Sequence, residues 1–115
     1  MDETPLVLDQ HAFERAKANP AFEDRCWLTF YLVGSTQAHS AMKPGLQELE
    51  GENLTGGEYG WIYAKVPVNL EFDHIGDRVA RVRTLCFETG VILDLIDLDS
   101  SSDVKASKFF TLWQR

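Results

Sequence analysis

The chain is short of several features that would place it in a class of protein. It has 2 cysteines and 4 prolines among 115 residues, and its 11 basic residues are outnumbered by 18 acidic ones. This deficit of lysine and arginine argues against direct nucleic-acid binding, because neutralising phosphates needs a positive surplus. No apolar run approaches the roughly 20 residues that span a bilayer, and residues 1–5 lack the basic and apolar parts of a signal peptide. We therefore expect a cytoplasmic protein without membrane attachment.

Motifs that carry known chemistry are also missing. The sequence contains no P-loop, GxSxG, HExxH or CxxC pattern. Cys26 falls in a strand pattern and Cys86 on an apolar helical stripe, so we expect two buried free thiols; whether they approach each other is left open. We predict no cofactor and no catalytic group.

Acidic residues gather near the end of the chain. The sequence from Asp97 to Asp103 loosely echoes a calcium loop, but it lacks the glycine of the sharp turn and the distal glutamate. We therefore predict no metal site. We interpret the cluster as solvated acids at the end of a strand, or as an acidic contact patch; its members are Asp94, Asp97, Asp99 and Asp103.

The residues that are present predict one domain over 1–115. Hydrophobic residues make up 44% of the chain and aromatic ones 11%, enough for a core. Alternating and helical apolar patterns define the elements. In chain order these are a helix over 9–19, a strand over 26–33, a helix over 35–51, a short edge strand over 52–55, a strand over 59–68, a helix over 73–89 and a strand over 91–98. Pro44-Gly45 predicts a kink in the second helix, or two short helices.

This order predicts an α+β fold of the ferredoxin-like type, a two-layer sandwich with β-α-β-β-α-β order and an antiparallel sheet. Its core covers about residues 25–99, after an N-terminal helix. The C-terminal tail is too apolar to extend freely into water, so we expect it to dock, more as a fifth strand than as a helix. The alternative is a homodimer in which the tail crosses to a partner. The residues concerned are Phe109, Phe110, Leu112 and Trp113.

The most informative side chains are four large aromatics on two expected strands. The alternation of the strands directs them to the sheet face opposite the main helices: Trp27, Tyr31, Trp61 and Tyr63. An exposed apolar patch of this kind marks a binding surface, and tyrosine and tryptophan are favoured there. Two interpretations stay open. Either the N-terminal helix and the tail cover this face, or the face is an interface or pocket wall.

Two further groups could bind anions. Arg78 and Arg81 lie three residues apart on one helix face and could hold an acidic partner, although a solvated face explains them more simply. The second group, between a strand and a helix, could bind an anion through backbone N–H groups, although a residue that only caps the helix explains it more simply. It comprises Gly34, Ser35 and Thr36.

The layout of residues 26–99 resembles a known family. An aromatic-rich strand and a helix precede a hairpin, and an amphipathic helix then ends in Glu88-Thr89-Gly90-Val91 before an acidic last strand. This resembles the regulator of ribonuclease activity B family, the protein inhibitors of ribonuclease E. The resemblance implies a ferredoxin-like fold and action by protein binding without catalysis.

Acidic charge, small size and the aromatic face together favour a non-enzymatic regulator or inhibitor. The expected partner is another protein, and a basic one such as a nuclease or a toxin would suit the net charge of −7. The alternative is a ferredoxin-like domain that binds or converts a small molecule, with the aromatic face as a pocket wall.

Overall fold

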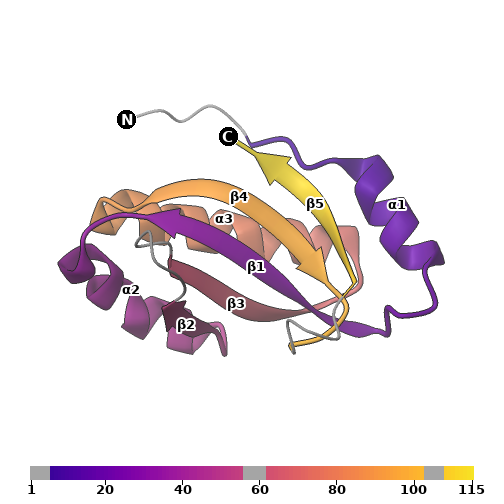
Figure 1. Ribbon diagram of the computed structural model, residues 1–115, viewed down its shortest axis with the longest axis horizontal. Helices are drawn as coiled ribbons and strands as arrows, with labels where there is room; N and C mark the ends of the chain where they lie inside the picture. Colours follow the sequence, from indigo (N-terminus) through magenta and orange to yellow (C-terminus); the bar gives the residue numbers. More distant parts are fainter. Residues whose placement is uncertain (1–5, 56–61, 103–107) are drawn as a thin grey trace.

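The computed structural model describes residues 6–55, 62–102 and 108–115, which form an α+β fold with one antiparallel sheet. The sheet has the strand order β2-β3-β1-β4-β5, and α3 lies behind it in Figure 1 while α1 stands beside β5. None of the helices in these three ranges is long and apolar enough to cross a membrane. The elements are α1 (Gln10–Ala18), β1 (Arg25–Val33), α2 (Thr36–Glu48), β2 (Glu52–Thr55), β3 (Ile62–Asn69), α3 (Phe72–Thr89), β4 (Ile92–Asp99) and β5 (Phe109–Gln114).

The central strand β1 is apolar on both faces, and this places it between β3 and β4. Every second side chain along it is fully buried beneath the helical layer: Cys26, Leu28, Phe30 and Leu32. The predicted apolar stripe of α3 is confirmed and belongs to the same core: Ile75, Val79, Val82 and Cys86. Both cysteines are buried free thiols, as expected.

Pro44 and Gly45 do not divide α2, which runs without interruption, so the expectation of two short helices is wrong. Pro44 is exposed, so water can reach the carbonyl group that its missing N–H leaves without a helical bond. Gly45 instead faces α3: a Cβ there would lie 2.3 Å from Cδ2 of Leu85. The pair therefore marks a close helix–helix crossing.

Two helix boundaries differ from those predicted. The turn after α2 places Glu50, not Gly51, at a left-handed φ of 59°, and the Gly51 N–H donates to a carbonyl in the last turn of the helix. Helix α3 begins at Phe72, one residue before the start predicted for the helix over 73–89. It ends at Thr89, as predicted, and Gly90 follows in the left-handed conformation, with φ 78°.

The C-terminal tail forms β5, an edge strand paired with β4, which confirms the prediction of a fifth strand. A register shift between Ile96 and Asp97 breaks the strict alternation that the sequence suggested. Leu112 is buried at this irregularity, and its carbonyl accepts a 2.8 Å hydrogen bond from the Asp9 N–H. The chain before α1 is therefore held against β5.

Candidate functional site

The predicted aromatic face is assembled by the pairing of β1 with β3. Tyr31 lies opposite Tyr63 in the register, and their ring centroids are 5.6 Å apart. Trp27 is on the same face of β1, where it is paired with Pro67, four residue pairs along the strands from Tyr31 and Tyr63. Trp61 lies outside the described residues. The structure thus brings Tyr31 and Tyr63 together, with Trp27 further along the same face.

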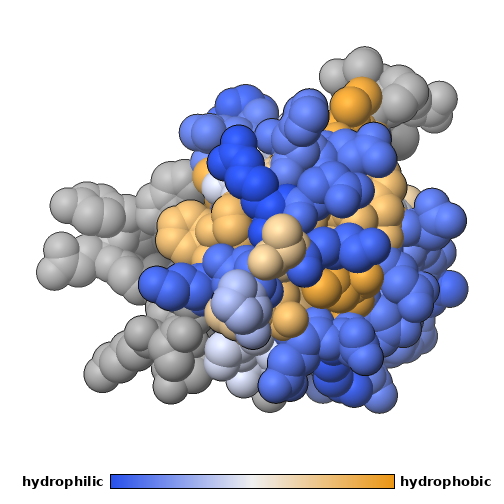
Figure 2. Space-filling model, turned by 90° about the vertical axis from the view of Figure 1, so that its right-hand side faces the viewer, coloured by the Kyte–Doolittle hydropathy of each residue, from blue (hydrophilic) through white to orange (hydrophobic). Residues whose placement is uncertain are grey.

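One of the two interpretations required helix α1 to cover this face, and the structure shows that it does not. Phe13 of α1 packs against Phe72 at the start of α3, with centroids 5.2 Å apart. Just after α1, Phe22 packs against Phe110, which the strand register places on the helical side of the sheet. Helix α1 and the tail therefore extend the helical layer and the sheet (Figure 1). In Figure 2, where the side with α1 faces the viewer, hydrophobic atoms appear between mostly hydrophilic side chains.

Polar side chains are buried on the same face, next to the tyrosines. Thr29 of β1 is paired with Lys65 of β3 on one side and with Asp97 of β4 on the other. Asp99 follows on β4 and is directed to the same face by the alternation of the strand. Thr29, Lys65, Asp97 and Asp99 are only 3%, 6%, 5% and 7% exposed, respectively. Such burial is unusual for charged groups and requires partners.

Those partners are supplied across the strands. The Lys65 ammonium lies 3.2 Å from Oδ2 of Asp99, which also accepts a hydrogen bond from the Thr29 hydroxyl group. Oδ1 of Asp97 accepts a 2.7 Å hydrogen bond from the Thr111 hydroxyl group of β5. The Lys65 ammonium thus pairs with Asp99, whereas Asp97 is bonded by Thr111, so β5 is needed to complete the cluster.

Burial governs the ionisation of this cluster. It raises the pKa of Asp97, and the charge of Asp99 adds to that increase, while the hydrogen bond from Thr111 opposes it. The pKa of Tyr31 is raised to about 12, first by burial and then by the negative charges of Asp97 and Asp99. The carboxyl groups therefore impose a negative field on the aromatic rim.

These side chains surround a hollow of about 360 Å³. Its lining consists of Thr29, Tyr31, Tyr63, Lys65, Asp97, Asp99 and Phe109. Carboxyl groups beside aromatic rings suit a cation, which gains from the negative charge and from the ring faces. Phe109, 61% exposed, offers an accessible ring at the rim. The arrangement fits a basic group better than an anion.

The acids of β4 were expected to be solvated, and this expectation is wrong for Asp97 and Asp99. The cause is the addition of β5, which surrounds them with neighbouring side chains. Asp94 is half-buried and lies 3.1 Å from Nε of Arg115. Asp103 lies outside the described residues. Asp97 and Asp99 are two residues apart, which predicts that they share one face of the strand. This spacing does not predict that they are buried.

The two predicted anion sites lie elsewhere. Arg78 and Arg81 share a helix face as expected, and both contact Asp77, at 2.9 and 3.6 Å. The hydroxyl group of Ser35 caps α2 by accepting from the Ala38 N–H. The adjoining Gly34 and Thr36 are exposed at the start of the helix. Neither group contributes to the hollow on the sheet face.

Comparisons of the chain with protein-family models, with curated proteins and with solved structures found no match. The resemblance to the regulator of ribonuclease activity B family therefore stays a prediction. Function has to be argued from the side chains on the open sheet face.

Replacing Asp97 with Asn is expected to stabilise the protein at neutral pH, by about 0.5–2 kcal/mol. A carboxyl group whose pKa is raised on folding stabilises the fold at low pH, and this contribution is lost as the pH rises from 3.8 through the folded pKa. Asn keeps an oxygen that can accept from Thr111 and carries no charge. Denaturant titrations from pH 4 to pH 8 should show a smaller decrease in stability with pH for Asp97→Asn than for the wild type. Equal pH slopes would contradict the raised pKa.

Proposed function

We propose that this protein is a non-enzymatic regulator or inhibitor that binds a basic protein partner through the open face of its sheet. The hollow receives a lysine or arginine side chain of that partner. The observation that carries this proposal is the buried cluster beside aromatic rings, in which Lys65 pairs with Asp99 and a second carboxyl group, Asp97, forms no ion pair with any residue that the structure describes.

The composition of the site supports binding more than catalysis. Tyrosine rings with neighbouring charged groups are typical of the few residues that dominate the energy of a protein interface. A net charge of −7 favours the approach of a basic partner from a distance. The partner's cation would restore charge balance in the hollow, since the cluster holds one more carboxyl group than ammonium groups.

The finer fold and location belong to the same proposal. The order β2-β3-β1-β4 with two long helices supports a ferredoxin-like core to which β5 is added at one edge. Two buried free thiols support action in the reducing cytoplasm. A nuclease or a toxin would be a partner of suitable charge.

A second candidate, binding of a small organic cation, is favoured by the concave shape of the hollow. A volume of about 360 Å³ is within the range of small-molecule sites. Both candidates use the same carboxyl groups and rings. They differ in whether the cation belongs to a protein or to a small molecule.

One titration tests the cation and a second experiment tests the partner. N-acetyl-lysine methylamide is expected to shift the NMR signals of Tyr31 and Tyr63, whereas the neutral norleucine analogue is not. Immobilised wild-type protein is expected to retain basic proteins from a lysate of the native host that Asp97→Asn does not retain. The matched control is Val33→Ala, an exposed apolar residue of β1 outside the hollow, which should retain the same proteins as the wild type.

The outcomes separate the candidates. Tyrosine shifts together with the loss of retained proteins in Asp97→Asn support the protein-binding function. Tyrosine shifts without any difference in retained proteins favour the small cation instead. If neither tyrosine responds to the lysine analogue and the retained proteins are identical, the open sheet face is not the binding site.

A further inference from the structure

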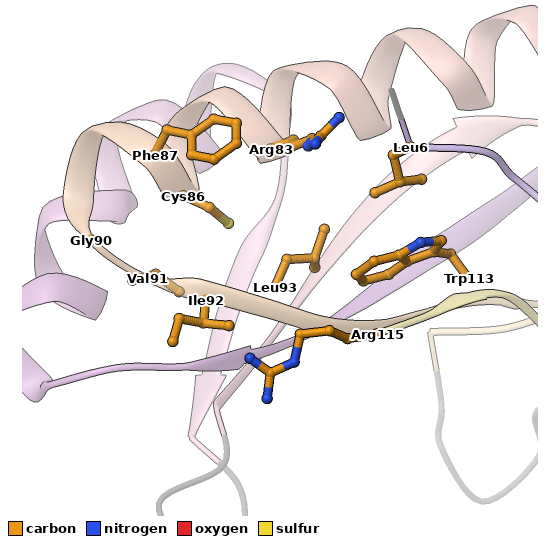
Figure 3. A pocket seen from close by; sticks show the side chains of 10 residues that line it. All are labelled: Leu6, Arg83, Cys86, Phe87, Gly90, Val91, Ile92, Leu93, Trp113 and Arg115. Atoms are coloured by element: carbon orange, nitrogen blue, oxygen red, sulfur yellow. The ribbon is translucent and has the colours of Figure 1, made fainter. Parts of the chain in front are cut away.

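A second hollow, larger and more apolar, lies on the opposite side of the sheet. Its volume is about 530 Å³, and it is bounded by the last turns of α3, the start of β4 and the end of β5 (Figure 3). Leu6, from the segment before α1, lies close to the Trp113 ring at one end. This hollow shares none of the residues of the aromatic face, and the inference drawn from it does not depend on the proposed function.

The hollow exists because the fifth strand widens the sheet beyond the helices that cover it. Helix α1 contacts one part of β5, Phe22 just after α1 packs against Phe110, and α3 contacts mainly β3 and β4 of the sheet. The helical side of Trp113 is therefore covered only in part, whereas Leu93 at the floor of the hollow is buried. Large apolar side chains at its margin stay accessible to water: Phe87 is 42% and Ile92 47% exposed.

Among the residues that the structure describes, the charged members of its lining are two arginines. Arg83 projects from α3 and lies 5.4 Å from the Phe87 ring, and Arg115 projects from the end of β5 on the other side of the hollow (Figure 3). Nε of Arg115 contacts Asp94, at 3.1 Å. A guanidinium group carries five N–H donors, so this contact involves only part of its capacity. The chain as a whole has a net charge of −7. A hollow whose described charged residues are two arginines therefore differs in charge from most of the molecule.

We propose that this hollow binds a medium-chain fatty acid. The apolar chain would lie against Leu93, Trp113 and Phe87, where it removes exposed hydrophobic surface from water. The carboxylate would be held by one of the two arginines, Arg83 or Arg115, which lie on opposite sides of the hollow, because guanidinium groups form charge-assisted hydrogen bonds with carboxylates. A volume of about 530 Å³ is within the range of small-ligand pockets.

The test uses the whole chain with dodecanoate below its micelle concentration, followed by titration calorimetry. We expect saturable binding of one dodecanoate, and an affinity reduced about tenfold or more in the double variant Arg83→Gln/Arg115→Gln, as loss of charged hydrogen bonds implies. Arg15→Gln, an exposed arginine of α1, is the matched control and should bind as the wild type does. Ile92→Asp, at an exposed site, should also weaken binding, because it places a negative charge in the apolar lining of the hollow.

Two further ligands define the results that would overturn the proposal. Dodecyltrimethylammonium has the same chain and the opposite charge, so equal binding of both compounds would show that the arginines do not select the head group. Vesicles of phosphatidylglycerol present an anionic surface without a free fatty acid. Binding to these vesicles in the absence of dodecanoate binding would assign the hollow to a membrane surface, and no binding to any of the three would leave the hollow without this ligand.

Discussion

Removing residues 109–115 is expected to unfold the protein, or to lower its free energy of unfolding by about 5 kcal/mol or more. The strand contributes the buried Leu112 and the partly buried Phe110 and Trp113, and burying a large apolar side chain contributes about 1.5–3 kcal/mol. Small domains have only about 5–15 kcal/mol of stability in total. Truncation would also remove the hydrogen bonds of β4 to β5 and the bond between Leu112 and Asp9. Thermal denaturation followed by circular dichroism measures the loss.

Two point variants measure how much individual side chains of β5 contribute to stability while the strand itself stays in place. Leu112→Ala is expected to cost about 2–5 kcal/mol, as for other buried leucines. Phe109→Ala, at an exposed position of the same strand, is expected to change stability by less than about 0.5 kcal/mol and to weaken cation binding at the sheet face. A truncated protein that keeps both its melting temperature and its mass in solution would contradict this role of β5. A truncated protein that changes from dimer to monomer would show that the tail crosses to a partner.

The parts of the fold that the sequence predicted are those determined by local patterns. The apolar residues of β1 and the helical stripe of α3 each required burial, and Gly90 supplied the left-handed residue that ends α3. The boundaries that differed depend on tertiary contacts. Phe72 extends α3 because it packs against Phe13, and no residue near Phe72 in the sequence announces that contact.

Pro44-Gly45 illustrates the same limit. From the sequence alone, this pair predicts a break in the helix. In the structure, Gly45 instead allows a close approach to Leu85 of α3, a helix that follows much later in the chain. A sequence pattern contains no information about the distance between two helices. Interpreting a glycine as a packing site therefore requires the fold to be known first.

The binding site was only half predictable for a related reason. Tyr31 and Tyr63 follow from strand alternation once β1 and β3 are paired. The burial of Asp97 depends instead on the register of β4 with β5, where Thr111 lies opposite it. A register shift, and a strand formed from a tail, are not determined by local propensity. Charged residues are exposed by default, so the cluster was predicted to be solvated.

Replacing Lys65 with Met is expected to destabilise the protein by about 3–5 kcal/mol, the usual cost of leaving one partner of a buried ion pair alone. The side chains of Lys65 and Asp99 are 7% and 10% exposed, so water cannot readily replace the ammonium beside Asp99. Met has a similar length and no charge, so lost packing contributes little. Urea denaturation at pH 7 measures the change. A comparable substitution of an exposed residue, Lys43→Met on α2, should cost less than about 0.5 kcal/mol.

Removing the rest of the cluster tests whether it serves binding or stability. The triple variant Lys65→Met/Asp99→Leu/Thr29→Val eliminates the ammonium, the carboxylate and the hydroxyl group that bonds to it. Replacing a whole buried ion pair by apolar groups of similar volume is often neutral or stabilising. We therefore expect the triple variant to recover most of the stability that Lys65→Met loses. We also expect it to bind the lysine analogue at least tenfold more weakly, because Asp99 no longer offers carboxylate oxygens to the cation, although the net charge of the cluster is unchanged.

The comparison distinguishes two reasons for a charged cluster on a sheet face. If the cluster mainly held the strands in register, the triple variant would remain as unstable as Lys65→Met, since no apolar set could replace its directional bonds. If it is retained for recognition, stability and binding will separate, with the fold recovered and the affinity for the cation lost. A triple variant that recovers stability and binds the lysine analogue with unchanged affinity would show that Asp99 and Lys65 take no part in recognition.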